Sequence, residues 1–293
     1  RHAIRTHIIS WVRPDGSFAA RKIECFSNQG AYASHGHSIA AKGMGCFPQT
    51  YPCANVEGDA WTVYTNRPTA GAMRGYGIPQ AMFAGESHID DIARTLGLTP
   101  LEYRMKFLMP RGYTDGFSKN ENYCDSFREV LEKGRIAADY DRKFELYQNQ
   151  TGPVRRGVGC AIFWYNTAVW PISLESSSCR MVLNQDGSVQ VQTGETEIGQ
   201  GCDTAYSQMA ADVLGIPVEN IHMVSTQDTD VTPFGTGAYA SRQTYVGSFS
   251  IQQTGLLLKE RILKYAQELT RQSPYLLDIE DGNIIRKTDG RVL

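Results

Sequence analysis

Three stretches of the chain share one pattern, in which a β-prone segment leads through a glycine-rich loop into a helix. Residues 178–192 alternate in polarity, and the Asp186-Gly187 pair between the two halves suits a tight turn with positive φ. The loop 194–201 follows, and residues 202–214 then place apolar side chains at helical spacing. The sequence therefore predicts a hairpin, a glycine-rich loop and a helix in this order.

The N-terminal part of the chain shows the pattern a second time. Residues 6–12 and 18–26 alternate around a turn and predict another hairpin, and residues 61–64 predict a short strand. The glycine-rich loop 67–80 comes next and contains Arg74. A helix is predicted after it, with inward positions at Met82, Glu86, Ile89, Ala93 and Leu96.

The third stretch is the loop 233–244, which is rich in glycine and hydroxyl residues, contains Arg242 and leads into a predicted helix over 245–269. Glycine lets backbone N–H groups approach a ligand closely, and a helix N-terminus favours an anion. One large anionic cofactor would explain all three loops. The alternative is that the glycines only form tight turns and that the arginines are surface residues in salt bridges.

These patterns predict an α+β fold of two domains, each a small mixed sheet with packed helices, with the cofactor site between them. The predicted boundaries are 1–120 for the first domain, 121–152 for a connector and 153–293 for the second domain. The connector is predicted because these residues are polar, with few apolar side chains outside a short helix at 127–138. A strand of small residues is expected at 157–163.

Composition removes several classes of function. The net charge is −2, so no basic field indicates binding to nucleic acid or to anionic lipid, and no apolar run reaches membrane-spanning length. The seven cysteines contain no Cys-x-x-Cys pair, which indicates reduced thiols and a cytoplasmic protein. His35 and His37 have no further ligand at a matching spacing, so a polar loop is favoured over a metal site.

Common nucleotide and hydrolase motifs are missing from the sequence. No Gly-x-x-x-x-Gly-Lys-Ser/Thr segment is present, which argues against a P-loop nucleotidase. The segment 235–240 approaches the dinucleotide-binding Gly-x-Gly-x-x-Gly pattern, but no β-α-β unit surrounds it. No Gly-x-Ser-x-Gly elbow occurs, so a serine hydrolase is not indicated.

Taken together, the loops resemble those of a known family. Residues 72–80 are similar to its Arg-Gly-aromatic-Gly-x-Pro-Gln loop, 196–201 to its Thr-Glu-x-Gly-Gln-Gly loop, and 237–244 to a third loop of small residues. The order is right, and the resemblance covers nearly the whole chain. The sequence resembles the molybdenum-binding subunit of the xanthine dehydrogenase/aldehyde oxidase family of molybdenum hydroxylases, in particular that of bacterial xanthine dehydrogenases.

This resemblance implies an oxidoreductase that hydroxylates a purine or related N-heterocycle with water as the oxygen source. The cofactor it implies is molybdenum-molybdopterin, in bacteria usually in the cytosine dinucleotide form. The metal is then held through the pterin dithiolene and not by a protein ligand. Iron–sulfur clusters and FAD are implied on partner subunits, and no nucleic-acid or membrane partner is expected.

The resemblance also assigns roles to individual residues. Arg74 matches the catalytic arginine beside the molybdenum oxo group, while Tyr76 and, more loosely, Trp170 match aromatic residues that stack on the substrate ring. The matched cofactor-binding positions are Arg74, Gly75, Gly199, Gln200, Gly201, Ala238, Ser241 and Arg242.

Three departures from the family pattern limit what is implied. Neither the upstream Gly-Gly-Gly-Phe-Gly loop nor the Gly-Glu-Pro segment that supplies a glutamate base occurs in residues 1–293. The chain is therefore expected to be an internal piece of a longer subunit, inactive by itself. Xanthine-specific relatives carry a substrate arginine in the stretch equivalent to 31–35, which here contains none. Another purine or N-heterocycle is thus expected to be the substrate.

Other functions remain compatible with the sequence. One is a non-catalytic module for cofactor binding or assembly, in which the missing glutamate is genuine. Another is an enzyme of the same fold with different chemistry, such as aldehyde oxidation, aromatic acyl-CoA reduction or oxidation of carbon monoxide.

Overall fold

The computed structural model describes residues 3–165, 167–168, 175–224 and 228–293. The chain divides into two compact units, unit 1 (Arg1–Tyr165) and unit 2 (Asn166–Leu293), and each is described by itself. Both combine helices with a small mixed sheet, so the predicted α+β class is confirmed. Within the described residues, no helix is both long enough and apolar enough to cross a bilayer.

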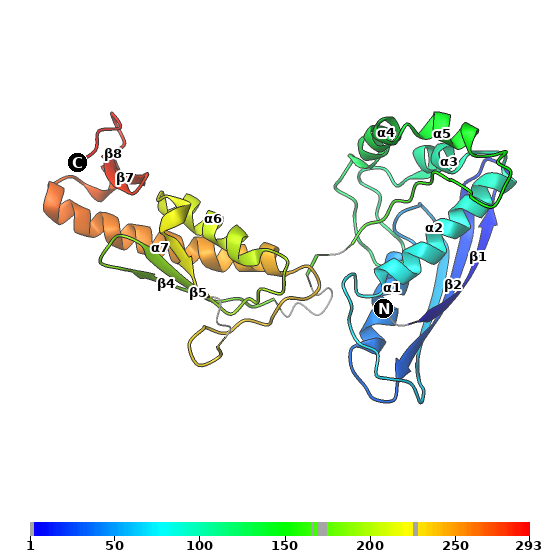
Figure 1. Ribbon diagram of the computed structural model, residues 1–293, viewed down its shortest axis with the longest axis horizontal. Helices are drawn as coiled ribbons and strands as arrows, with labels where there is room; N and C mark the ends of the chain where they lie inside the picture. The colour runs from blue at the N-terminus through cyan, green and yellow to red at the C-terminus, as the bar shows by residue number, and fades with distance from the viewer. Residues whose placement is uncertain (1–2, 166, 169–174, 225–227) are drawn as a thin grey trace. The chain divides into compact units, whose positions relative to one another are not determined.

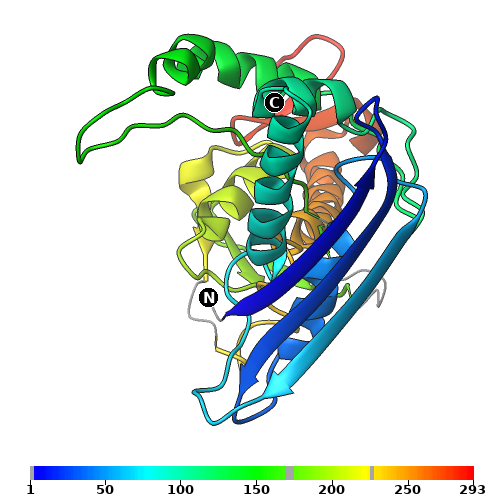
Figure 2. The same cartoon turned by 90° about the vertical axis from the view of Figure 1, so that its right-hand side faces the viewer.

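Unit 1 is a three-stranded sheet with helices against one face (Figures 1 and 2). In Figure 2 its strands, dark to light blue, lie side by side in the order β1-β2-β3, with α1 behind them. β1 pairs antiparallel with β2, and β2 pairs parallel with β3. The elements of unit 1 are β1 (Ile4–Val12), β2 (Phe18–Gly30), α1 (Gly36–Cys46), β3 (Val56–Tyr64), α2 (Ile78–Thr95), α3 (Pro100–Phe107), α4 (Phe127–Ala138) and α5 (Tyr140–Leu146).

Helix α2 buries the face that its periodicity predicts. Ile89 and Ala93 are completely buried, and Glu86, at one of the predicted inward positions, is only 7% exposed. Helix α3 begins with a reciprocal cap, in which the Thr99 hydroxyl accepts from the Glu102 amide and the Glu102 carboxylate accepts from the Thr99 amide. These local signals fix where both helices begin and which face they bury.

A buried carboxylate is acceptable on α2 because it meets a buried guanidinium from α3. Arg104 Nε lies 2.8 Å from Glu86 Oε2, and Arg104 Nη1 lies 2.7 Å from Asp90 Oδ1. Glu86 also accepts hydrogen bonds from the Tyr51 hydroxyl and the Ile162 amide, each at 2.9 Å. One carboxylate therefore ties four segments of unit 1 together.

Several expectations for unit 1 need correction. Residues 121–152 are not a separate connector, because Leu131 of α4 and Tyr140 of α5 belong to its main core, and the division between units follows Tyr165. Residues 157–163 form no strand; the amide of Ile162 goes to Glu86 and its side chain into the core. Helix α1 was not predicted, since its small residues carry little amphipathic signal.

Unit 2 repeats the chain path of unit 1. Its sheet has the order β4-β5-β6, with an antiparallel pair followed by a parallel one, as in β1-β2-β3. Both units read β-β-α-β-α in this part, so the hint of two related domains in the sequence is seen in the topology. The elements of unit 2 are β4 (Cys179–Leu183), β5 (Val189–Thr193), α6 (Cys202–Leu214), β6 (Ile221–Met223), α7 (Gln243–Thr270), β7 (Leu277–Glu280) and β8 (Asn283–Arg286).

The core of unit 2 lies between this sheet and helices α6 and α7 (Figure 1). Val191 of β5, Tyr206 and Ala210 of α6, and Ile251 of α7 are completely buried in it. Small residues let the two helices approach the sheet and each other, since a Cβ at Gly247 would lie 2.3 Å from the Tyr206 hydroxyl. The predicted helices at 202–214 and 245–269 are thus confirmed, the second one starting two residues earlier.

We predict that Glu86→Gln lowers the local unfolding free energy of α2 and α3 by about 3 kcal/mol, because it leaves the buried Arg104 with only Asp90 as a charged partner. Amide hydrogen exchange in peptides from both helices should then accelerate about 100-fold. The control is Glu129→Gln, which removes an exposed ion pair with Lys133 and should change exchange little. Equal exchange in the two variants would contradict the prediction.

Candidate functional site

The predicted site residues fall into two groups, one in each unit. Arg74, Gly75 and Tyr76 lie in the 67–77 loop between β3 and α2 of unit 1. The others lie in unit 2. Gly199, Gln200 and Gly201 are in the 194–201 loop between β5 and α6, and Ala238 and Ser241 are in the 233–241 loop, which Arg242 follows directly before α7. Trp170 lies outside the described residues. In both units these loops follow the carboxyl ends of parallel neighbouring strands, the edge at which α/β sheets commonly bind ligands.

The end of the 67–77 loop has an unusual backbone that only its sequence permits. Gly75, Tyr76 and Gly77 all have positive φ, at 104°, 48° and 91°. A Cβ at Gly77 would lie 2.2 Å from the Ile39 carbonyl oxygen of α1, so only glycine fits there. Helix α2 begins at the next residue, and Arg74 is exposed at the start of this turn. The turn therefore presents a permanently charged, bidentate donor on a rigid support.

Tyr76 is held by a residue that the sequence reading did not connect with it. The Nδ1 atom of His35 lies 2.8 Å from the Tyr76 hydroxyl, and the two rings meet edge to face with centroids 6.0 Å apart. His35 immediately precedes α1, so it comes from the other loop at this edge of the sheet. The predicted substrate-stacking ring is thus oriented by His35, whose Nδ1 is used by a hydroxyl.

In unit 2, the N-terminus of α6 is bound by a carboxylate of the protein itself. Glu197 accepts hydrogen bonds from the amides of Gly199, Gly201 and Asp203 at 2.6, 3.1 and 3.2 Å. These bonds, the one from Gly201 foremost, lower the pKa of Glu197 to about 2. The sequence predicts a loop suited to an anion, and in this structure the three amides bind the carboxylate of Glu197.

The Gln200 side chain folds back over its own loop. Its Oε1 accepts from the Ile198 amide at 2.7 Å, and its Nε2 donates to the Thr196 carbonyl at 2.9 Å and to Gln243 Oε1 at 2.6 Å. Gln243 Nε2 in turn donates to the Thr196 carbonyl at 2.8 Å. Gln243, the first residue of α7, was not among the predicted site residues, yet it joins α7 to the 194–201 loop.

The 233–241 loop combines open backbone with a left-handed turn. Gly237 has φ 101° and open space where a Cβ would stand, whereas Ala240 and Ser241 have φ 53° and 54° without being glycine. Ala238 is half-buried and Ser241 is exposed. The loop therefore has open space at the Cβ position of Gly237 and an exposed serine at Ser241.

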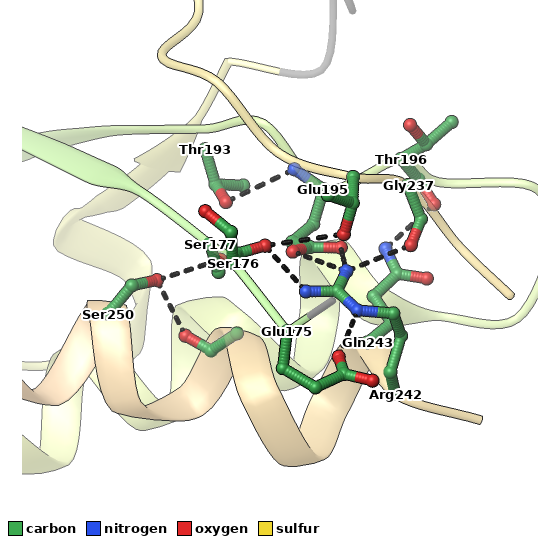
Figure 3. Close-up of polar contacts among 12 residues, drawn as sticks. Glu175, Ser176, Ser177, Thr193, Glu195, Thr196, Gly237, Arg242, Gln243 and Ser250 are labelled. Atoms are coloured by element: carbon green, nitrogen blue, oxygen red, sulfur yellow. Dashed lines mark hydrogen bonds and ion pairs between the residues drawn. The ribbon is translucent and has the colours of Figure 1, made fainter. Parts of the chain in front are cut away.

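Arg242 points away from solvent, into unit 2 (Figure 3). Its Nη1 lies 3.0 and 3.1 Å from the two carboxylate oxygens of Glu195 and 3.0 Å from the Gly237 carbonyl oxygen. Its Nε donates to Glu175 at 2.5 Å, and its Nη2 to the Ser176 carbonyl at 2.6 Å. The guanidinium is completely buried, and each of its nitrogens has a protein partner, so in this structure Arg242 connects loops of unit 2.

The side chains of a potential metal-binding group near α6 are already engaged in hydrogen bonds within the protein. Glu197, Cys202 and Asp203 bring one possible ligand atom each within 4.8 Å of one another. The Glu197 oxygens already accept backbone amides, and the Cys202 thiol donates to Asp203 Oδ1 at 3.7 Å. We therefore assign these three residues to the N-terminus of α6 and not to a metal.

The backbone geometry and the exposed donor side chains of the loops fit an anionic pterin cofactor. Gly199, Gly201 and Gly237 have positive φ and open space at the Cβ position, so a flat ligand can approach their backbone closely. Arg74 and Ser241 are exposed and can donate hydrogen bonds to oxo or phosphate oxygens.

We predict that Glu197→Gln destabilises unit 2 at neutral pH and that the difference disappears in acid. The pKa of Glu197 falls from its ordinary 4.5 to about 2 on folding, so its stabilising effect is complete above pH 4.5 and is lost as the pH falls through 2. Thermal unfolding midpoints measured between pH 2 and 8 test this, with Asp212→Asn, exposed on the same helix, as the control. A loss of stability that does not depend on pH would be inconsistent with the assigned role.

Comparisons with known proteins identify the domains to which both parts of the chain are similar. Residues 133–292 and residues 1–108 each match a molybdopterin cofactor-binding domain. The chain is 44% identical to the putative xanthine dehydrogenase molybdenum-binding subunit of Escherichia coli strain K12, over 97% of this chain and 38% of that protein. It is 27% identical to a probable hypoxanthine oxidase of the same strain, over 100% of this chain and 31% of that protein.

A solved structure shows the same fold. Quinoline 2-oxidoreductase from Pseudomonas putida 86 superposes with a TM-score of 0.81 and 26% sequence identity, over 99% of this chain and 39% of that one. The chain thus spans less than two fifths of the length of these relatives. The chain belongs to the xanthine dehydrogenase/aldehyde oxidase family of molybdenum hydroxylases, within which it carries two molybdopterin cofactor-binding domains.

Proposed function

We propose that this chain is the molybdenum-cofactor-binding part of an enzyme that hydroxylates a purine or related N-heterocycle, with water as the oxygen source. The observation that carries the proposal is the match of both parts of the chain to molybdopterin cofactor-binding domains, in a sequence 44% identical to a xanthine dehydrogenase molybdenum-binding subunit. A non-catalytic cofactor-binding module is the outcome that the experiments below must exclude.

The cofactor, when bound, supplies the two-electron redox chemistry and the oxygen transfer. The protein's own residues bind and orient. Arg74 would place a permanent positive charge beside the oxo group, where it stabilises negative charge that develops on oxygen. With the Gly199 and Gly201 amides occupied by Glu197, these glycines would let the pterin lie close to the loop. The Ala238 backbone and the exposed Ser241 hydroxyl would hold the cofactor through hydrogen bonds.

The substrate class follows from the ring that Tyr76 presents and from the relatives. Because His35 fixes the orientation of the Tyr76 ring, this ring is better suited to stacking on a flat substrate than a freely rotating ring would be. Three of the relatives are named for xanthine, hypoxanthine and quinoline, which are all fused aromatic N-heterocycles. Because residues 31–35 contain no arginine, we propose a purine or N-heterocycle other than xanthine.

The same proposal extends to the cofactor form and to partners. We propose the cytosine dinucleotide form of molybdopterin, cytoplasmic location, and electron transfer to iron–sulfur and FAD subunits. The relative's description as a subunit supports the presence of partner subunits. The 293 residues alone are proposed to be inactive, since the segment that supplies the glutamate base in the family has no match among them.

The first test is metal and nucleotide analysis of the full-length subunit, purified with its partner subunits from a host that makes the cofactor. We expect about one molybdenum per subunit and release of a cytidine nucleotide on acid treatment. A folded protein with neither would exclude the proposed function. Molybdenum with turnover of aldehydes but not of N-heterocycles would keep the cofactor and replace the substrate class.

The second test is Arg74→Ala in the full-length enzyme. We expect turnover per bound molybdenum to fall about 100-fold, because a positive charge facing a developing negative charge is lost. Arg67→Ala, an exposed arginine earlier in the same loop, is the matched control and should keep wild-type turnover. Unchanged turnover per molybdenum in Arg74→Ala would defeat the assignment of Arg74.

A further inference from the structure

The two cofactor-site loops of unit 2 meet a single buried side chain, that of Arg242 (Figure 3). Its Nη1 is bonded to Glu195 in the 194–201 loop and to the Gly237 carbonyl in the 233–241 loop. One nitrogen thus bridges two segments more than 40 residues apart in sequence. Glu195 has no exposed side-chain surface, so this ion pair is fully removed from water.

The backbones of the two loops also cross at a point where no side chain fits. A Cβ at Gly194 would lie 2.3 Å from the Gly235 amide nitrogen, and one at Gly235 would lie 2.6 Å from the Gly194 carbonyl oxygen. These glycines allow the crossing, but backbone contact alone gives little directional restraint. Polar contacts next to the crossing add this restraint. Glu195 follows Gly194 in sequence, and Arg242 joins it to the Gly237 carbonyl, two residues after Gly235.

The backbone beside Arg242 needs such a restraint. Ala240 and Ser241 are consecutive non-glycine residues with left-handed φ, a conformation that costs free energy and persists only where the surrounding structure imposes it. Arg242 is the next residue and is fixed by contacts to four other residues. Burial of its guanidinium therefore imposes the turn that leaves Ser241 exposed.

We propose that Arg242 is a positioning residue: through Glu195 and the Gly237 carbonyl it holds the 194–201 and 233–241 loops in one fixed arrangement, and it does not contact the cofactor. This inference rests on the proposed function of these loops and adds to it which residues preset them. Gln243 continues the same connection one residue later, through Gln200 and Thr196. The resemblance matches Arg242 to a position that binds the cofactor, whereas the geometry assigns it to a buried position from which it holds the two loops together.

The competing explanation is that the Arg242–Glu195 pair only stabilises unit 2. Both explanations predict that Glu195→Gln lowers stability, because it leaves a buried guanidinium short of one charge. Only the positioning role predicts that amide exchange increases selectively in the 194–201 and 233–241 loops. Glu86→Gln is the matched control, since it removes the same charge from a similarly buried arginine–glutamate pair, which lies in unit 1.

The experiment compares Glu195→Gln, Glu86→Gln and wild type in the full-length holoenzyme. Two quantities are measured: the rate at which molybdenum is released on dilution, and amide exchange in peptides covering 196–201 and 236–241. We expect Glu195→Gln to release molybdenum on the order of tenfold faster, as for residues that orient metal-site ligands, and to accelerate exchange in both loops together. Glu86→Gln should leave amide exchange in the 196–201 and 236–241 peptides at the wild-type level.

Wild-type release and exchange in Glu195→Gln would overturn the positioning role, as would an equal change of amide exchange in these peptides in the Glu86→Gln control. Arg242→Lys, which keeps the charge but cannot reach all five partner atoms, is measured in the same way if Glu195→Gln does not fold. A wild-type protein without molybdenum would contradict the proposed function alone. Coupled exchange of the two loops needs no cofactor and would still decide the role of Arg242.

Discussion

Each unit of this protein depends on one arginine that is completely removed from water and paired with two carboxylates. In unit 1, Arg104 meets Glu86 and Asp90; in unit 2, Arg242 meets Glu195 and Glu175. A buried guanidinium without partners is very unfavourable, so each arginine restricts the backbone positions of every segment that supplies an acceptor. In unit 1 the restricted segments are helices and core, whereas in unit 2 they are the loops of the candidate site.

This difference relates stability to function in unit 2. The exposed, left-handed loop backbone is poorly stabilised by packing, because glycine and small residues bury little apolar surface. The loops are instead stabilised by hydrogen bonds and ion pairs from Arg242 and Gln243 at the start of α7, and by Glu197, which binds the N-terminus of α6. The loops can therefore be open to a ligand and still hold a defined shape, a condition for preorganised binding.

Local patterns in the sequence predicted much of this fold, because each depends on neighbouring residues. The hairpins follow from alternation and turn residues, and the inward face of α2 from periodicity. Helix α1 was missed because Gly43 and its small neighbours, which let the helix approach the Gly77 carbonyl, carry no amphipathic signal. The polar segment at 121–152 looked like a connector because a few core contacts, such as those of Leu131 and Tyr140, decide its placement.

The candidate loops could be located from glycines and motifs, but the direction of a side chain could not. Arg74 and Arg242 look alike in sequence, each in a small-residue loop before a helix, yet the first is exposed and the second buried. Burial of Arg242 depends on Glu175 and Glu195, which are distant in sequence and reach it only in the folded sheet. The hydrogen bond between His35 and Tyr76 could not be predicted either, because the two residues are 41 positions apart in sequence and meet only in the folded protein.

The repeated β-β-α-β-α path gives each unit two loops at the carboxyl edge of its parallel strands. In unit 1 the first of these, residues 31–35, is exposed and makes few core contacts, yet its last residue, His35, orients Tyr76. Substitutions in residues 31–35 can change the surface next to Tyr76 without disturbing a buried charge or a strained turn. A repeated chain path of this kind can thus keep one loop free of buried charges and strained turns, so that its sequence can change at little cost in folding stability.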